Sequence, residues 1–349
     1  MPLIRESGTR KRTPRAVLIA AVWLFLIHLA VLCADFVAPY DFTEQKRLFP
    51  FAPPTRIHFI DPGGGFHLRP FVCLSVPDSR PGIARALYKE DCRQRFPLRL
   101  LVEGTPYRLG FLTLRLHFFG TDEPGAIHLM GTDGFGRDQF SRFLHGGRIS
   151  LLGGILACGL SLAISLLAGT IAGFYGGWVD NILMWFADLF LALPWLYLLF
   201  AVRAFLPLHM KPATAFLIII AIIGIAGWPR SARLIRGVVL VAREREYVLA
   251  ARSFGASDAY LMRKHVIPQA LSVVMTQAPL LIPRYVLAEI TLSFLGLGVN
   301  EPAVSWGLML AALQQYHVLI SYSWMFLPAL ALAPTFYSYF ALSERIRAE

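Results

Sequence analysis

Residues 250–268 read AARSFGASDAYLMRKHVIP, a basic stretch that separates two long apolar runs at residues 213–228 and 270–299. A charge at the centre of a transmembrane helix costs about 2.5–3.5 kcal/mol, so the cations in and around this stretch keep it out of hydrocarbon. These cations are Arg243, Arg245, Arg252, Arg263 and Lys264. The sequence therefore predicts a water-facing segment between two membrane-spanning helices.

The composition of the chain is that of an integral membrane protein. Its 349 residues are 56% hydrophobic and its mean hydropathy is +0.56, which is too apolar for a soluble domain to bury. The net charge of +11 could indicate a nucleic-acid partner, but most arginines flank apolar runs, and RNA-binding and zinc-finger motifs are absent from the sequence. We therefore expect a lipid bilayer around the chain and no nucleic acid as a partner.

Six apolar runs are predicted to cross the membrane, since a span needs about 20 residues. The first follows five cations of the N-terminal tail and is predicted to be a retained anchor, because a cleaved signal peptide has a shorter core, of roughly 7–15 residues. The fifth contains Pro279 and Pro283, which are expected to kink it. The six runs are residues 16–37, 149–175, 182–202, 213–228, 270–299 and 318–342.

The distribution of lysine and arginine predicts the orientation of these spans. The N-terminal tail has five (Arg5, Arg10, Lys11, Arg12 and Arg15), residues 230–264 have eight, and the C-terminal tail has Arg345 and Arg347. With six spans all three segments lie on one side, which the positive-inside rule assigns to the cytoplasm together with both termini. The loop at residues 203–211 puts two cations on the other side, against this trend.

The sequence predicts an all-α membrane protein with six transmembrane helices and a β-containing extracytoplasmic insertion between helices 1 and 2. Strands are expected at residues 98–102 and 107–116 around a turn at 103–106, with another turn at 61–65. Cys73 and Cys92 lie in this insertion, where they either form a disulfide or remain two free thiols. The predicted divisions are a tail with the first helix (1–38), the insertion (39–148) and a five-helix core (149–349) with a cytoplasmic segment at 230–268.

Within the cytoplasmic segment, the residues predict two helices joined at a sharp corner. A helix over residues 231–254 should end at Gly255, since glycine suits the left-handed position after a helix. Ser257 can cap a second helix that begins at Asp258, whose carboxylate suits the positive end of the helix dipole. Pro268 is expected to mark the next change of direction.

The same segment resembles the signature of the permeases of ATP-binding-cassette (ABC) importers. That signature is Glu-Ala-Ala, three residues, Gly, nine residues, Ile, any residue, Leu-Pro, and this chain has Ala250-Ala251, Gly255 and Pro268 at the same spacing. It departs from the pattern at Leu249, His265 and Ile267, although His at the second of these positions is common in the peptide and nickel branch. Residues 131–150 and 292–307 also resemble segments of that branch, so the resemblance runs from about residue 128 to the C-terminus.

The resemblance implies the membrane subunit of a bacterial inner-membrane importer for di- or oligopeptides, or for nickel or glycosides. It implies a second permease subunit, two ATPase subunits and an extracytoplasmic substrate-binding protein as partners. The corner would be the coupling helix that sits in a groove of the ATPase. The residues that it assigns to coupling are Ala250, Ala251, Gly255, Ala256, Ser257, His265 and Pro268.

ATP chemistry is expected on the partner subunits and not on this chain. A phosphate-binding P-loop needs Gly-Lys-Ser/Thr, and none of the five lysines precedes Ser or Thr. The nine histidines also lack the spacing of metal ligands. We therefore predict a chain that is not an enzyme and binds no cofactor or metal itself, with ATP and Mg on its partners.

Three charged residues within the apolar runs are further candidates for function. Asp188, Arg284 and Glu289 either line a polar pathway or contact other helices, because intramembrane charges are costly unless they are used or paired. The rival class of protein, a secondary transporter or channel, would use them to couple ions. A membrane-anchored enzyme is a weaker alternative, because the insertion shows no nucleophile and base at a recognisable spacing.

Overall fold

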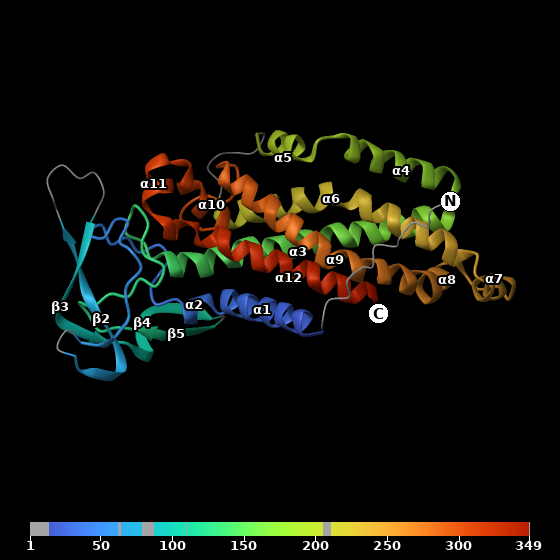
Figure 1. The fold of residues 1–349 in the computed structure, drawn as a ribbon. Coiled ribbons are helices and arrows are strands. Elements are labelled where there is room, and N and C mark those ends of the chain that lie inside the picture. The colour runs from blue at the N-terminus through green and yellow to red at the C-terminus, as the bar shows by residue number, and fades with distance from the viewer. Residues whose placement is uncertain (1–13, 62–63, 79–86, 110, 205–210, 349) are drawn as a thin grey trace, which may run out of the picture.

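The computed structural model describes all residues except 1–13, 62–63, 79–86, 110, 205–210 and 349. Long helices lie side by side, with the β-strands gathered at one end and the short helices α7 and α8 at the other (Figure 1). The predicted tail cations Arg5, Arg10, Lys11 and Arg12 lie outside the described residues, as does most of the loop at 203–211.

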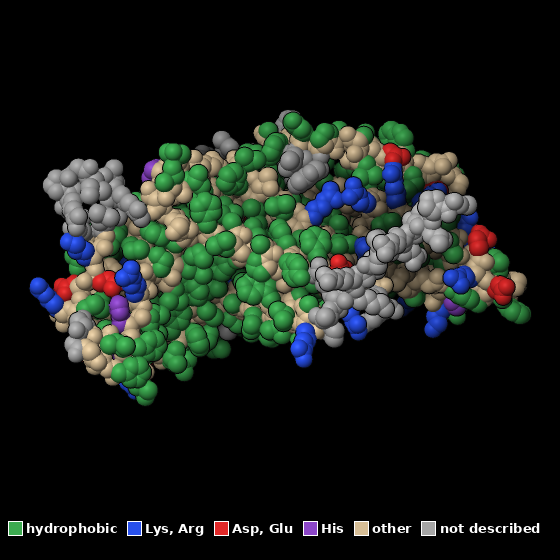
Figure 2. All heavy atoms as spheres, in the orientation of Figure 1, with side chains coloured by type: hydrophobic (Ala, Val, Ile, Leu, Met, Phe, Trp, Pro, Cys, Tyr) green, Lys and Arg blue, Asp and Glu red, His purple; other side chains and the backbone are tan. Residues whose placement is uncertain are grey.

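Five helical segments among the described residues are long and apolar enough to cross a membrane. They confirm a mostly helical membrane protein. On the face shown in Figure 2, a broad hydrophobic band separates the charged side chains at the β-strand end from those at the α7–α8 end. The five segments contain the helices α1 (Pro14–Leu32), α3 (Gln139–Tyr175), α6 (Pro212–Arg243), α9 (Ile267–Phe294) and α12 (Leu327–Ala348).

The predicted span at residues 182–202 is not one helix. It is divided between α4 (Gly177–Ala192) and α5 (Trp195–Ala204). The break falls at Leu193, which is extended (φ −78°, ψ 129°), because a residue before proline disfavours the helical conformation and Pro194 follows. The prediction of a single helix was therefore wrong.

Helices α3 and α6 run parallel. Helices α4 and α5, which lie between them in the sequence, bring the chain back from the end of α3 to the start of α6. The Arg243 guanidinium at the end of α6 donates hydrogen bonds to the carbonyls of Gly173 (3.1 Å) and Phe174 (3.2 Å) near the end of α3. Arg236 on α6 also forms two hydrogen bonds of 2.5 Å each with the buried Asp180 of α4. The three helices are thus tied together at the α7–α8 end.

Glycines on α3 allow its backbone to touch α6. A Cβ on Gly169 would lie 2.5 Å from the carbonyl oxygen of Ala232, and one on Gly173 would lie 2.8 Å from Val239. Small residues four apart let membrane helices approach in this way. The third glycine of the pattern, Gly177, lies outside α3 at the start of α4 and faces open space.

Two helices begin at residues other than those predicted. Helix α3 starts at Gln139 and not at residue 149, because the Asp138 carboxylate accepts the backbone N–H of Ser141 at 2.7 Å and caps it. Helix α12 starts at Leu327 and not at residue 318, since the chain turns at Tyr322 (φ −128°, ψ 77°). The residues before it form α10 (Trp306–Ala311) and α11 (Tyr316–Ser321), with single turns at Ala312–Gln314 and Ser323–Phe326.

The insertion contains two antiparallel sheets after the short helix α2 (Ala34–Val37). One has the order β1 (His58–Ile60), β2 (Phe66–Asp78), β3 (Leu87–Pro97), and the other pairs β4 (Arg99–Leu109) with β5 (Leu112–Gly120). The turn predicted at 61–65 is confirmed between β1 and β2, although residues 62–63 lie outside the description. Buried Val72, Phe96, Phe119 and Ile127 form the apolar centre of this region.

The turn predicted at residues 103–106 was wrong. Strand β4 continues through these residues with a shift of register between Glu103 and Tyr107. Gly104 and Pro106 suggested a turn, but both lie within an irregular strand. Gly104 there packs against the imidazole ring of His117. A Cβ on Gly104 would be only 2.6 Å from the imidazole of His117.

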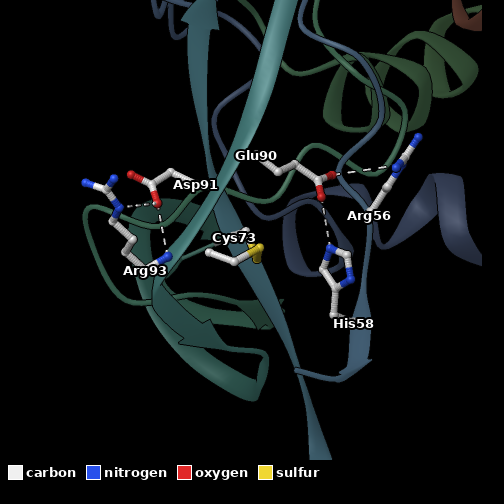
Figure 3. The surroundings of a disulfide bond; sticks show 7 residues. Arg56, His58, Cys73, Glu90, Asp91 and Arg93 are labelled. Atoms are coloured by element: carbon white, nitrogen blue, oxygen red, sulfur yellow. Dashed lines mark hydrogen bonds and ion pairs between the residues drawn. A yellow bond between two sulfur atoms is a disulfide. The ribbon is translucent and has the colours of Figure 1, made fainter. Parts of the chain in front are cut away.

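Cys73 and Cys92 form a disulfide between β2 and β3, with an S–S distance of 1.99 Å. Of the two alternatives that the sequence left open, the structure shows the bonded one. Figure 3 shows His58 from the neighbouring strand beside the bond, with its Nε2 3.1 Å from Glu90 Oε2.

Candidate coupling site

Helices α7 (Glu246–Ser253) and α8 (Asp258–Leu261) form a corner at the end of the bundle opposite the β-strands (Figure 1). The predicted continuous helix over residues 231–254 was wrong, since α6 ends at Arg243 and Arg245 is extended (φ −66°, ψ 139°). Residues 243–246 are all charged. A further turn of helix here would therefore have no apolar side chain to pack against neighbouring helices. The chain therefore changes direction before α7.

The end of α7 is a complete Schellman motif. Gly255 has φ +84°, the left-handed conformation that was predicted for it. Its N–H donates to the carbonyl of Arg252 at 3.0 Å, and the N–H of Ala256 donates to the carbonyl of Ala251 at 3.1 Å. Ala251 and Ala256 also pack on the same hydrophobic cluster, which is the apolar contact that accompanies this motif. Ala251, Gly255 and Ala256 together fix the angle of the corner.

The start of α8 completes the corner. The Ser257 hydroxyl accepts the backbone N–H of Tyr260 at 3.3 Å, as predicted for a capping residue. Across the corner Arg252 lies 3.5 Å from Asp258, but both side chains are about half exposed, so this pair contributes little.

The inner side of the corner is packed onto three long helices. Val248 of α7 and Leu261 of α8 are buried, and Phe174 of α3, Ile235 of α6 and Ala270 of α9 belong to the same cluster. The Arg252 guanidinium also lies 5.4 Å from the centre of the Phe174 ring, within range of a cation–π interaction. A force applied to α7 is therefore passed to α3, α6 and α9 together.

The connection from α8 to α9 is continuous helix, so the prediction of a change of direction at Pro268 was wrong. Residues Met262–Val266 form a π-helix that runs directly into α9, and Pro268 is the second residue of α9. His265 lies in the π-helix between the rings of Tyr247 (5.5 Å) and Tyr260 (5.8 Å). His265 thus contacts both α7, through Tyr247, and α8, through Tyr260.

The outer side of the corner is exposed and partly apolar. Phe254, directly before Gly255, is 91% exposed, and Leu249 and Tyr260 are about half exposed. Ala250 is exposed beside them. Sequence reasoning missed Phe254, although an aromatic residue next to a predicted helix-ending glycine was a usable signal. A large ring in water is unfavourable, which makes this side a candidate surface for a partner protein.

The three charged residues proposed for a pathway lie apart. Asp188 on α4 contacts Arg233 on α6. Arg284 is on the exposed side of α9. Glu289 is buried, accepts a hydrogen bond of 2.6 Å from the Ser293 hydroxyl and lies near the hydroxyls of Ser150 and Ser305. The structure does not bring the three together as one site.

A polar cluster at the opposite end joins the two outer sequence segments that resemble permeases. Glu301 lies 2.9 Å from the guanidinium of Arg137 and 3.0 Å from that of Arg142. The Trp306 backbone N–H donates to the Ser150 hydroxyl at 3.1 Å, so the start of α10 is fixed to α3. Sequence reasoning did not single out Glu301, because its partners are more than 150 residues away.

Comparison with known proteins shows the family of the chain. Residues 165–347, more than half of the chain, match the family model described as "Binding-protein-dependent transport system inner membrane component". The chain is 35% identical to the dipeptide transport system permease protein DppC of Bacillus subtilis over 226 residues, which cover 64% of this chain and 68% of that protein. It is 38% identical to the oligopeptide transport system permease protein OppC of the same organism over 225 residues (64% and 71%).

A crystal structure of an amino acid ABC transporter with histidines resembles the chain with a TM-score of 0.41 and 16% identity, over 59% of this chain and 92% of that one. The resemblance first indicated by residues 250–268 is confirmed by the family match, which includes them. The chain therefore belongs to the family of binding-protein-dependent transport system inner membrane components, the multi-pass permease subunits of ABC transporters.

Proposed function

We propose that this permease moves di- or oligopeptides across the bacterial inner membrane by alternating access. The names of its dipeptide and oligopeptide relatives support this choice of substrate. Its partners in the proposal are a second permease subunit, two ATPase subunits that hold ATP and Mg, and an extracytoplasmic substrate-binding protein. Free energy enters because the ATPases contact the permease differently in their two states.

The single observation that carries the proposal is the two-sided corner at α7 and α8. One side is packed onto three membrane-spanning helices through Val248 and Leu261, and the other presents Phe254 to solvent. A partner protein that binds Phe254 and Leu249 and changes conformation would therefore move the ends of α3, α6 and α9. Ala250, Ala251, Gly255, Ala256, Ser257, His265 and Pro268 give the corner its shape in this mechanism.

We assign the α7–α8 end to the cytoplasm, together with both termini. Helices α1 and α12 contact each other through Trp23 and Thr335 (3.1 Å) and through His28 and Tyr339 (3.0 Å), and Figure 1 shows that they run in opposite directions. The start of α1 and the end of α12 thus lie at one end, opposite the β-strands. A disulfide in the β-strand region supports an extracytoplasmic position for it, because disulfides persist in oxidising compartments.

Of the three intramembrane charges, we propose that Arg284 faces the peptide pathway or the second permease. It is exposed on α9 in the isolated chain, and a cation in a span is costly unless it meets a polar surface. Asp188 and Glu289 have contacts within the chain, which favours structural roles for them.

The proposal is tested by replacing Phe254 with alanine in the assembled transporter and measuring bound ATPase and peptide uptake. We expect both to fall, since the ring is the largest exposed apolar group at the corner. Tyr316→Ala is the matched control, because Tyr316 is 76% exposed on α11 at the other end. Unchanged ATPase binding and uptake in Phe254→Ala would refute the proposed coupling surface.

A further inference from the structure

Strand β5 has one apolar face that the described structure leaves largely uncovered. Leu112, Leu114, Leu116 and Phe118 alternate along it, and side chains two apart point to the same side of a strand. Leu112, Leu116 and Phe118 are 41–66% exposed, and Phe111 in the turn is fully exposed. Such a stripe is unusual in a segment that faces only water.

The contacts of the hairpin place strand β5 against α2, the short helix that directly follows α1. The Phe118 ring is 6.0 Å from that of Phe36 in α2, and His117 Nδ1 donates to the carbonyl of Ala38 at 2.6 Å. The hairpin therefore passes α2 in the direction of α1, as Figure 1 shows.

The lengths of the elements allow the turn to reach beyond α2. The six residue steps of strand from Phe118 to Leu112 extend about 20 Å, whereas the four residues of α2 extend only about 6 Å. A hairpin that runs along α1 therefore brings Phe111 and Leu112 level with the last turns of that helix. There Phe25, Leu29 and Leu32 are exposed on a helix apolar enough to cross a membrane.

The opposite face of the hairpin is polar and cationic. Arg108 pairs with Thr113 in the register of β4 and β5, and Arg115 follows on the same face as Thr113. All three side chains are exposed. Guanidinium groups bind phosphate oxygens with strong, directional hydrogen bonds, and a segment with one apolar and one cationic face is suited to the lipid–water interface.

We propose that the β4–β5 hairpin docks into the outer end of the bilayer beside α1, with Phe111 and Leu112 among acyl chains and Arg108 and Arg115 at lipid phosphates. The apolar stripe continues the lipid-facing surface of α1, and this continuity selects lipid as the occupant. Figure 2 likewise shows hydrophobic side chains that run from the helices onto the β-strand region. The inference holds whichever solute is transported.

Depth-dependent fluorescence quenching tests the proposal in the complete transporter. Replacing Cys33 and Cys158, the two free cysteines among the described residues, by serine leaves the disulfide intact. The fluorophore NBD is then attached at Phe111→Cys or, as the matched control, at Arg93→Cys on β3, where the side chain is 92% exposed. The labelled protein is placed in vesicles of phosphatidylcholine and phosphatidylglycerol.

At Phe111→Cys we expect blue-shifted emission, strong quenching by nitroxide-labelled acyl chains and weak quenching by aqueous iodide. At Arg93→Cys we expect the reverse. Iodide quenching at Phe111→Cys equal to that at Arg93→Cys would place the turn in water and overturn the proposal. Protection from both quenchers would also overturn it, since the occupant would then be protein.

A second labelling site guards against misfolding of the first variant. NBD at Thr113→Cys leaves Phe111 and Leu112 in place, and we expect it to be quenched by nitroxides near the headgroups. Adding Phe111→Asp and Leu112→Asp should shift this label toward iodide access, because charges are costly in hydrocarbon. An unchanged quenching pattern after these substitutions would contradict lipid insertion.

Discussion

The backbone N–H of Ala256 donates to the carbonyl oxygen of Ala251 at 3.1 Å, across Gly255. This bond closes the corner between α7 and α8 and turns Ala256 back onto the hydrophobic cluster that also holds Ala251. The corner is therefore a defined angle in the backbone and not a loose loop. Its geometry requires a residue that accepts φ +84°.

Gly255→Ala should uncouple transport from ATP hydrolysis. A residue with a Cβ costs about 1–2 kcal/mol in the left-handed conformation, so the corner should open or shift. We expect peptide uptake per ATP hydrolysed to fall in the reconstituted transporter. Gly237→Ala on α6 is the matched control, because that glycine also faces open space but lacks a positive φ. Equal effects of the two substitutions would contradict the role of the conformation.

Asp180→Asn should destabilise the contact of α4 with α6. The substitution removes a carboxylate that accepts two hydrogen bonds of 2.5 Å from Arg236. We expect the free energy of unfolding to fall by about 1–3 kcal/mol, less than for a fully buried pair because Arg236 is one-third exposed. Thermal unfolding in detergent measures this. Asp258→Asn, at a pair that is half exposed, should change it by less than about 1 kcal/mol.

Removing the disulfide by Cys73→Ala and Cys92→Ala should loosen the insertion. The two residues are 19 apart in sequence, and a crosslink of that loop length stabilises by about 3 kcal/mol. Hydrogen exchange in β2 and β3 should rise, while exchange in α3 and α6 should not. In the unfolded but unreduced protein, maleimide should label two cysteines, Cys33 and the otherwise buried Cys158; labelling of all four would refute the bond.

Glu289→Ala should lower stability more than Glu289→Gln. Alanine leaves a cavity and removes the acceptor of the Ser293 hydroxyl, which together cost at least about 2 kcal/mol. Glutamine keeps the volume and an acceptor oxygen. Leu287→Ala, at an exposed position of the same helix, controls for lipid-facing truncation. A lower melting temperature for the glutamine variant than for the alanine variant would contradict this expectation.

The sequence predicted the parts of the fold that rest on local chemistry. Gly255 and Ser257 were assigned from residue type alone, because only a few residues suit a left-handed position or a helix cap. The long apolar runs likewise showed which segments are membrane helices. Pro194 was a sequence signal for the break between α4 and α5. The prediction of one continuous helix followed instead from the high hydropathy of residues 182–202.

The features that the sequence could not predict depend on distant partners. The first turn of α3 contains Arg142, a buried cation whose partner Glu301 lies 159 residues away. The irregular path of β4 follows from the His117 ring that fills the space over Gly104. Each case needs the tertiary contact before the local pattern can be interpreted.

The contact of α3 with α6 at Gly169 and Gly173 also limits how the subunit can change shape. At these glycines the two backbones are in direct contact, without flexible side chains between them. We therefore expect α3 and α6 to move together as one rigid unit when the corner is displaced. Any hinge must then lie in the segments that connect them. The interrupted pair α4 and α5, with its joint at Pro194, is where we expect the bending between inward-open and outward-open forms.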